Sequence, residues 1–256
     1  MNTYWTLDKN GNQVLRDLAE ENKSYSNEAY RQGLFDANNY QYYEMFHHYV
    51  NEDNGCDYER LGCEIREGDI VLDLGANIGV FANRALLRGA KRVVSFEPIT
   101  PTFNCLVKNV RWSNGKVIPL KLGVNGNKGV SNFKIHTDFT HIGGGTTDPV
   151  NSLEDKNIVY EEMAVMMDIN DIFDSFDKSF NFMKIDVEGA EVSILTNITD
   201  DNLSSLRCLG AEFHSYGKEF DEFQDSFLAR MHRLGFRTYT LYHSNSGLRT
   251  INCWKA

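Results

Sequence analysis

The sequence predicts an α/β protein built on a buried, mostly parallel sheet, and three observations lead to that fold class. Gly68 to Pro98 reads as a strand, a glycine turn, a helix and a second strand, which together form a βαβ unit. Phe180 to Asp186 is another apolar run, and it ends at an acidic residue just before a helical pattern. The 256 residues are 41% apolar and 24% charged, which suits one large globular domain with or without a small appendage.

Each part of the βαβ unit follows from local pattern. Ile70 to Leu74 is short and almost wholly apolar, as expected for a parallel strand buried on both faces. Ile78 to Leu87 carries apolar residues at helical spacing, and Gly89 ends that helix. Arg92 to Phe96 is the next strand and leads into Glu97. The turn between the first strand and the helix is therefore a candidate cofactor site, because helix N-terminal N–H groups bind anionic groups.

The glycines of this turn indicate the class of cofactor. A dinucleotide-binding turn has the pattern G-x-G-x-x-G, whose middle glycine lets the main chain approach a pyrophosphate. Here Asn77 stands at the middle position and Val80 at the third. The spacing D-x-G-x-x-x-G from Asp73 to Gly79, with Glu97 ending the next strand, instead resembles the S-adenosylmethionine (SAM) site of class I methyltransferases.

Residues 1–66 precede this unit and are rich in Asn, Tyr and Glu. Aromatic residues at helical intervals predict helices near Asn12 to Glu21, Asn27 to Leu34 and Tyr40 to Val50. We expect a helical extension that caps the substrate side of a cofactor-binding domain at residues 67–256. Packing explains any single tyrosine of this segment better than substrate contact does, but some of them should line the substrate pocket.

Strands and helices alternate along the rest of the chain. We expect strands at 117–124, 133–136, 163–167, 180–186 and 206–214, helices at 100–110, 169–176, 186–198 and 217–234, and a terminal hairpin of 236–242 and 248–254. Three consecutive glycines between His141 and Thr146 predict either a lid over substrate or a mobile loop.

Composition excludes several classes of function. The net charge of −10 would repel a nucleic-acid backbone, and no basic stripe is visible, so we expect a small-molecule acceptor and no nucleic acid. No apolar run reaches the length of a membrane span and the start lacks a leader pattern, so we expect a cytoplasmic protein. The five cysteines lack metal-binding spacing and are expected to be reduced, and His47-His48 is expected at the surface. Oligomeric state leaves no signal in the sequence.

With these pieces in place, the chain resembles the FkbM family of SAM-dependent methyltransferases. The matching motifs are GDIVLDLGANIG, the acid in SFEP and above all MKIDVEGAE at Met183 to Glu191. YEMFHHYV at Tyr43 to Val50 and AEFH at Ala211 to His214 also resemble that family. The resemblance implies a Rossmann-like sheet of seven strands in the order 3-2-1-4-5-7-6, with one antiparallel strand supplied by the terminal hairpin. It also implies O-methylation of a small molecule, most often a sugar, a nucleotide-linked sugar or a glycoconjugate.

The resemblance assigns cofactor contacts to particular residues. The glycine turn would pass beside the methionine part of SAM, Glu97 would accept from both ribose hydroxyls, and the turn after the third strand would pass the adenine. The residues so assigned are Asp73, Gly75, Ala76, Asn77, Gly79, Glu97, Pro98, Val124 and Asp186. An NAD(P)-dependent oxidoreductase and a SAM-binding protein without catalysis are the alternative functions. Asn77 and Val80 disfavour the first, and the acids Asp186, Glu188 and Glu212 disfavour the second.

Methylation of an alcohol needs a general base, a metal that lowers the hydroxyl pKa, or both. We expect the catalytic residues to be Asp186, Glu188 and His214, which lie at the carboxyl ends of two predicted neighbouring strands. His214 shares a strand face with Glu212, so it is either the base or a residue that orients Glu212 by a hydrogen bond.

A divalent metal is the other route to activation. Metal-dependent catechol-type O-methyltransferases place acidic ligands at these two strand ends, so the resemblance makes Asp186 and Glu212 candidate ligands of Mg²⁺ or Mn²⁺. Those enzymes carry a lysine three residues after the first acid, where this chain has Gly189. In the metal-free alternative, Asp186 or Glu188 binds sugar hydroxyls directly.

Overall fold

A computed structural model describes residues 3–7, 13–17, 56–136, 158–214, 218–243 and 248–255. The strands are β1 (Thr3–Leu7), β2 (Gln13–Asp17), β3 (Ile70–Leu74), β4 (Arg92–Phe96), β5 (Val117–Leu120), β6 (Gly123–Asn125), β7 (Gly129–His136), β8 (Ile158–Asp168), β9 (Phe182–Ile185), β10 (Cys208–Phe213), β11 (Arg237–Tyr242) and β12 (Arg249–Trp254). The helices are α4 (Val80–Leu87), α5 (Thr100–Asn109), the 3₁₀ turn η1 (Arg111–Ser113), α6 (Ile169–Ser175), α7 (Glu191–Asn197), α8 (Asp200–Ser205) and α9 (Lys218–Arg233).

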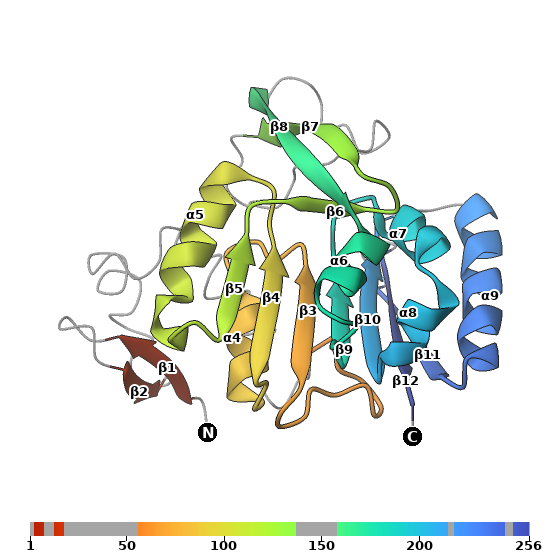
Figure 1. Cartoon of the computed structure of the whole chain (residues 1–256), viewed down its shortest axis with the longest axis horizontal. Helices are drawn as coiled ribbons and strands as arrows, with labels where there is room; N and C mark the ends of the chain where they lie inside the picture. The colour runs from red at the N-terminus through yellow and green to blue at the C-terminus, as the bar shows by residue number, and fades with distance from the viewer. Residues whose placement is uncertain are drawn as a thin grey trace.

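The central sheet has seven strands in the order β11-β12-β10-β9-β3-β4-β5 (Figure 1). The pairs β3–β4, β4–β5, β3–β9 and β9–β10 are parallel. Strand β12 runs antiparallel to both β10 and β11. This confirms the predicted order 3-2-1-4-5-7-6, with the terminal hairpin supplying the one antiparallel strand. Because β3, β4, β9 and β10 are parallel, their carboxyl ends meet at one edge of the sheet.

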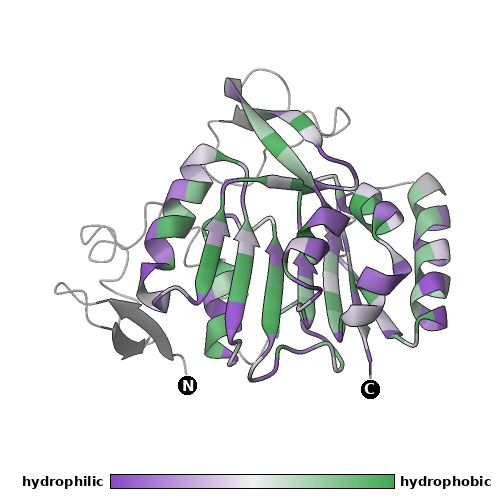
Figure 2. Cartoon of the chain, in the orientation of Figure 1, coloured by the Kyte–Doolittle hydropathy of each residue, from purple (hydrophilic) through white to green (hydrophobic). Residues whose placement is uncertain are grey.

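The central strands are apolar (Figure 2), and both faces of this sheet are covered. Along β3, Leu72 and Leu74 pack into a cluster with residues of α6, α7, α8 and α9. Val71 points to the other face and packs with residues of α4, of α5 and of the segment before β3. This alternation is the reason that the parallel strands read as continuous apolar runs.

A second sheet of three strands, β6-β8-β7, stands beyond the carboxyl ends of the central strands (Figure 1). We predicted one strand over 117–124, but the chain divides it into β5 and β6, and β6 joins β8 of the second sheet. Gly123 permits this departure, because a Cβ there would lie 2.3 Å from the sulfur of Met166. Hydrophobic period alone cannot show that one run serves two sheets.

The predicted helix over 12–21 is wrong where the structure describes it. Residues Gln13–Asp17 form β2, which pairs with β1 in an antiparallel ladder. Asn10-Gly11 separates the two strands in the sequence, and Asn-Gly is a strong hairpin signal that the helical interpretation overlooked. The predicted helices at 27–34 and 40–50, His47-His48 and the glycine loop at 143–145 lie outside the described residues.

The segment just before β3 belongs to the same packed body as the sheet. Cys56, Tyr58, Cys63 and Ile65 are buried in the cluster that also contains α4. The core therefore begins before residue 67, where we placed the domain boundary.

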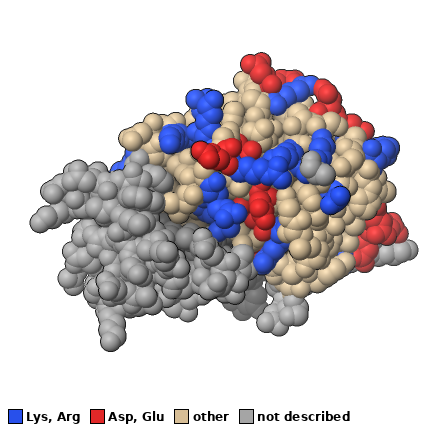
Figure 3. Space-filling view, turned by 90° about the horizontal axis from the view of Figure 1, so that it is seen from below, with Lys and Arg blue, Asp and Glu red and all other residues tan. Residues whose placement is uncertain are grey.

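Basic and acidic side chains from distant parts of the chain are interspersed over the face at the amino ends of the strands, which Figure 3 shows from below. Lys91 and Arg92 enter β4, Lys116 precedes β5 and Arg237 begins β11, and all four are exposed. Acidic residues are interspersed among them. Strands β5 and β11 are the two edge strands of the sheet, so these basic side chains are spread across its whole width.

Two further findings concern the described residues alone. All five cysteines are free thiols and buried, in agreement with the predicted reduced state. None of the helices described is both long and apolar enough to cross a membrane.

Candidate functional site

The glycine turn after β3 folds back over the end of β4. The N–H groups of Gly75 and Ala76 both donate to the carbonyl of Phe96, at 3.0 and 2.9 Å. Gly75, Asn77 and Gly79 have φ angles of 75°, 51° and 91°, in the left-handed region that glycine and asparagine tolerate best. The turn is therefore a fixed shape that ends at the N-terminus of α4.

The first glycine allows two strand ends to touch. A Cβ on Gly75 would lie 1.7 Å from the carbonyl oxygen of Asp186, at the end of β9. The turn that we assigned to the cofactor is thus in direct contact with the acid that we assigned to catalysis. In the structure, Gly75 therefore makes room for the main chain of β9.

Glu97 closes the other side of the turn. Its Oε2 accepts from the N–H of Asn77 at 2.8 Å, and its Oε1 accepts from Ile99 N–H at 3.0 Å and Thr102 Oγ1 at 2.7 Å. Burial raises the pKa of this carboxyl group, and these three hydrogen bonds oppose that rise. A carboxylate has about four acceptor positions, so one position on Oε2 remains for a ligand hydroxyl. That capacity fits one ribose hydroxyl of SAM, while we had expected two.

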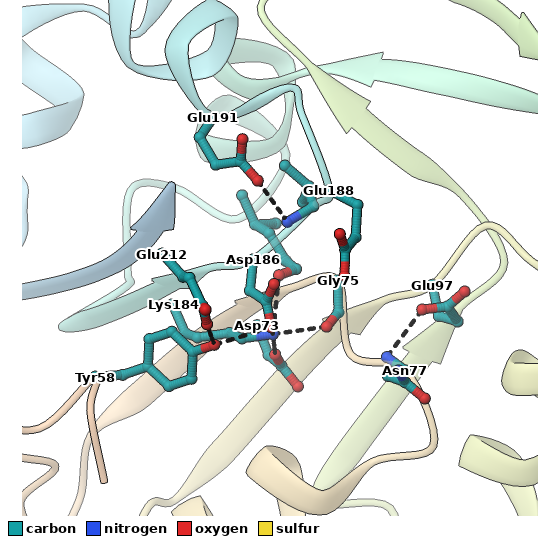
Figure 4. A network of polar contacts seen from close by, with 12 residues as sticks. Tyr58, Asp73, Gly75, Asn77, Glu97, Lys184, Asp186, Glu188, Glu191 and Glu212 are labelled. Atoms are coloured by element: carbon teal, nitrogen blue, oxygen red, sulfur yellow. Dashed lines mark hydrogen bonds and ion pairs between the residues drawn. The ribbon is translucent and has the colours of Figure 1, made fainter. Parts of the chain in front are cut away.

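A polar row crosses the buried strands beneath the turn (Figure 4). Asp73 pairs in register with Ser95 of β4 and Lys184 of β9. The Ser95 hydroxyl donates to Asp73 Oδ2 at 3.1 Å, and Lys184 Nζ lies 3.6 Å from Asp73 Oδ1. Asp73 is fully buried, and burial raises its pKa. Asp73 therefore supports the turn from below and offers no exposed oxygen to a cofactor.

Lys184 is the cation at the centre of this row. Its Nζ donates to the carbonyls of Gly75 at 2.6 Å and Leu74 at 3.3 Å, and it lies 3.4 Å from Asp186 Oδ2. Burial opposes the charge on Lys184, but Asp186 and Asp73 raise its pKa above the usual value. The ammonium group therefore stays charged and fastens the glycine turn to the end of β9.

Acidic side chains gather at the carboxyl ends of β9 and β10 (Figure 4). Burial would raise the pKa of Asp186, but the charges of Lys184 and His214 lower it. Glu188 has a φ of 56°, a left-handed conformation that is uncommon for this residue type, and burial raises its pKa to about 7. Burial and the charge of Asp186 also raise the pKa of Glu212. The neighbouring carboxyl groups at this edge therefore differ in pKa: that of Asp186 is lowered, and those of Glu188 and Glu212 are raised.

His214 contacts Glu191, and not Glu212 as we had considered. Its Nδ1 lies 3.0 Å from Glu191 Oε1, and its Nε2 lies 3.4 Å from Glu188 Oε2 and 4.0 Å from Asp186 Oδ1. Glu191 is fully buried and also accepts from the N–H groups of Val187 and Gly189. Burial would lower the pKa of His214, but these carboxylates raise it to about 10. At neutral pH the imidazole is therefore protonated and paired with acids.

The point where Asp186 and Glu212 converge is occupied by a phenol. Tyr58 Oη lies 2.9 Å from Asp186 Oδ2 and 2.7 Å from Glu212 Oε2. Among the described residues, the group of side chains close enough to share a cation is instead Asp186, Glu188 and His214, whose ligand atoms lie within 4.8 Å of one another.

The structure brings most of the predicted site residues to one edge. The glycine turn lies between two of the other groups: Asn77 donates to Glu97 on one side, and Gly75 touches Asp186 at the end of β9 on the other. Val124 is the exception, because its side chain is buried in the large apolar cluster. Pro98 is partly buried beside Gly123.

Sequence reasoning missed Tyr58, Lys184 and Glu191. Lys184 and Glu191 both lie in the MKIDVEGAE motif, from which we selected only Asp186 and Glu188 as catalytic residues. Tyr58 is one of 12 tyrosines, and nothing local marks it.

Comparisons with known proteins relate the chain to a family and to a fold. Residues 73–238 match the profile of the methyltransferase FkbM domain. The hexuronic acid methyltransferase AglP of Haloferax volcanii is 29% identical over 155 residues, which are 59% of this chain and 59% of that protein. The crystal structure of methyltransferase FkbM from Methylobacillus flagellatus has a TM-score of 0.52 and 17% identity, covering 83% of this chain and 49% of that one. The chain thus spans about three fifths of the first relative and about half of the second.

Proposed function

Because the chain belongs to the FkbM methyltransferase family, we propose that it transfers a methyl group from SAM to a hydroxyl of a sugar, a nucleotide-linked sugar or a glycoconjugate. The observation that carries this proposal is the direct contact between the glycine turn and the acidic end of β9, within the residues that match the family. The relative that acts on a hexuronic acid supports a sugar acceptor.

The cofactor part of the proposal rests on the turn and Glu97. When bound, SAM supplies a methyl group on a positively charged sulfur. The remaining acceptor position of Glu97 Oε2 would receive a ribose hydroxyl. The N-terminus of α4 has neither an acid in its first turn nor a side-chain cap at Gly79, so its N–H groups would receive the methionine carboxylate.

Glu188 is the general base of the proposed reaction. The carboxylate must take the proton that the acceptor hydroxyl releases as its oxygen bonds to the methyl group. Glu188 projects from a left-handed turn at the sheet edge, and 38% of its side chain is exposed. His214, held by Glu191 and already protonated, stays beside Glu188 as a fixed positive charge. Asp186 is then available to accept from a neighbouring hydroxyl of the sugar.

The metal predicted at Asp186 and Glu212 stays a prediction. The Tyr58 hydroxyl lies where an ion would join these two carboxylates, so the proposal assigns no step to a metal. Turnover measured in excess EDTA, then with added Mg²⁺ or Mn²⁺, tests this directly. We expect full activity in EDTA, and restoration by added metal after a loss would require an ion at this edge.

The proposed function is tested by incubating the protein with SAM and a panel of acceptors. The panel pairs glucuronic acid with glucose and UDP-glucuronic acid with UDP-glucose. We expect S-adenosylhomocysteine to form together with an acceptor that is heavier by one methylene unit. Calorimetric titration with SAM and with NADH separates the alternatives, because an oxidoreductase would bind NADH and a non-catalytic protein would bind SAM without turnover.

A further inference from the structure

Tyr58 reaches the acidic edge from a segment far away in the sequence. It lies 128 residues before Asp186 and 154 before Glu212, yet its hydroxyl is within hydrogen-bond distance of both carboxylates. Its side chain is fully buried. A hydroxyl has a single proton, so the two carboxylates share one donor and both lie beside the same oxygen.

The main chain around Tyr58 is built into the sheet. Gly210 of β10 lies beneath it, and a Cβ there would approach the Tyr58 carbonyl oxygen to 2.5 Å. Asn252 of β12 donates to the carbonyl of Asp57 at 2.8 Å and accepts from the N–H of Arg60 at 3.3 Å. Cys63 contacts the Tyr58 carbonyl through sulfur at 3.6 Å. The position of the phenol is therefore set by β10 and β12, which are separated from β3 by β9.

The ring itself is fixed by two neighbours. Phe81 of α4 packs edge-on against it, with centroids 5.7 Å apart and planes at 84°. The ammonium group of Lys184 lies 5.5 Å from the ring centroid. Because Lys184 also holds the Gly75 carbonyl, the phenol, the cofactor turn and β9 share one set of contacts.

These contacts give the two oxygens of Asp186 different neighbours. Oδ2 is taken by Tyr58 at 2.9 Å and by Lys184 at 3.4 Å. Oδ1 is the oxygen that faces His214, at 4.0 Å from Nε2, on the side where Glu188 lies. Removing the phenol hydroxyl would let the Asp186 side chain rotate, and it would leave Glu212 without this donor.

We propose that Tyr58 is a positioning residue for methyl transfer, which orients Asp186 and Glu212 toward the acceptor without touching it. This inference rests on the proposed function for its kinetic test, but its structural test does not. Groups held in position in this way stabilise the transition state. A small displacement of such a group therefore lowers kcat more than it weakens substrate binding.

Tyr58→Phe tests the proposal because it removes one oxygen and keeps the ring against Phe81 and Lys184. We expect kcat to fall by about 10- to 100-fold, the range that supporting hydrogen bonds show elsewhere, with SAM affinity and acceptor KM little changed. Tyr242→Phe is the matched control, because Tyr242 is 63% exposed on β11 and should leave all three parameters unchanged. A general loss of structure would instead lower SAM binding and thermal stability together.

Crystal structures of wild type and Tyr58→Phe provide the test that needs no turnover. We expect the Asp186 and Glu212 carboxylates to change rotamer in the variant. Unchanged carboxylates, or an unchanged kcat, would overturn the role of Tyr58. If wild type methylates no acceptor of the panel, the proposed function fails, while the rotamer comparison still decides whether Tyr58 orients the acids.

Glu212→Gln is the alternative test if the Tyr58→Phe variant does not fold. This variant keeps an oxygen that accepts from Tyr58 and removes one of the two charges. We expect a smaller loss of kcat than the loss predicted for Tyr58→Phe. A larger loss would mean that the charge of Glu212, and not the orienting hydroxyl, drives the reaction.

Discussion

The protonation state of Glu188 controls the pH dependence that we predict for methyl transfer. Burial raises its pKa to about 7, so the carboxylate that accepts a proton becomes the main form only above that pH. We expect kcat/KM to rise as the pH increases through about 7 and then to level off. Glu188→Gln should remove this rise and lower kcat by about 10²- to 10⁴-fold, the usual contribution of a general base. A variant with the wild-type pH profile would contradict this assignment.

The raised pKa of Glu188 also makes the stability of the folded protein depend on pH. The pKa of Glu188 is raised above its unfolded value of 4.5, so the folded state binds this proton more tightly. That contribution is fully present below the unfolded pKa and is lost as the pH rises through about 7. Chemical denaturation of wild type and Glu188→Gln at several pH values measures the difference.

Glu97 provides the residue-scale test of cofactor binding. Glu97→Ala should weaken SAM binding by about 1.5 to 3 kcal/mol, because a charge-assisted hydrogen bond to ribose is lost and the turn loses its tie at Asn77. Thr102→Val is the control, since it removes one protein donor to Oε1 and leaves Oε2 in place. Calorimetry gives both affinities. Equal affinity of wild type and Glu97→Ala would mean that the ribose lies elsewhere.

At the scale of elements, the β3 turn and β9 approach so closely that no side chain fits between them at Gly75. Gly75→Ala places a Cβ 1.7 Å from the Asp186 carbonyl oxygen, so the two strand ends must separate. We expect it to destabilise the fold by about 1 to 3 kcal/mol more than a glycine replacement without a clash, and to weaken SAM binding. Urea denaturation and calorimetry measure the two effects.

Gly115→Ala is the matched control for this substitution. Gly115 has a φ of 78°, close to the 75° of Gly75, but a Cβ there has no atom within 4 Å. It should therefore show the cost of the left-handed backbone alone, about 1 to 2 kcal/mol. If both variants lose the same free energy of unfolding, the close approach at Gly75 does not contribute to the destabilisation.

At the scale of the whole molecule, the segment before β3 is joined to α4 by a buried ion pair. Glu59 pairs with Arg84, and their side chains are only 2% and 9% exposed. Glu59 Oε1 also accepts from the N–H of Ile65 at 3.0 Å. This pair holds in place the segment that carries Tyr58.

Glu59→Gln should destabilise the protein by about 3 to 5 kcal/mol, because it removes the negative charge from a buried ion pair. Asp201→Asn is the control, since the Asp201 side chain is 77% exposed in its pair with Lys178 and should hardly matter. Thermal unfolding of both variants gives the comparison. A small effect of Glu59→Gln would show that the ion pair contributes little to holding the segment.

The sequence by itself determined the parts whose signal is local. The apolar run of β3, the turn from Gly75 to Gly79 and Glu97 after β4 follow from spacing, since strand and helix periods differ and glycine marks the turn. The length and order of elements then allowed the family resemblance to predict the sheet order, which the structure confirms. MKIDVEGAE marked the acidic edge for the same reason, because its acids are adjacent in the chain.

Only the tertiary structure decided which of these groups meet. Tyr58 and Asp186 are joined by a hydrogen bond across 128 residues, and no local pattern records such a contact. The protonation states also depend on burial and on charges from other strands, which is why His214 is a protonated partner of Glu191 and not a free base. The division of one apolar run between β5 and β6 was hidden likewise, because hydrophobic period reports burial but not the sheet in which a strand is buried.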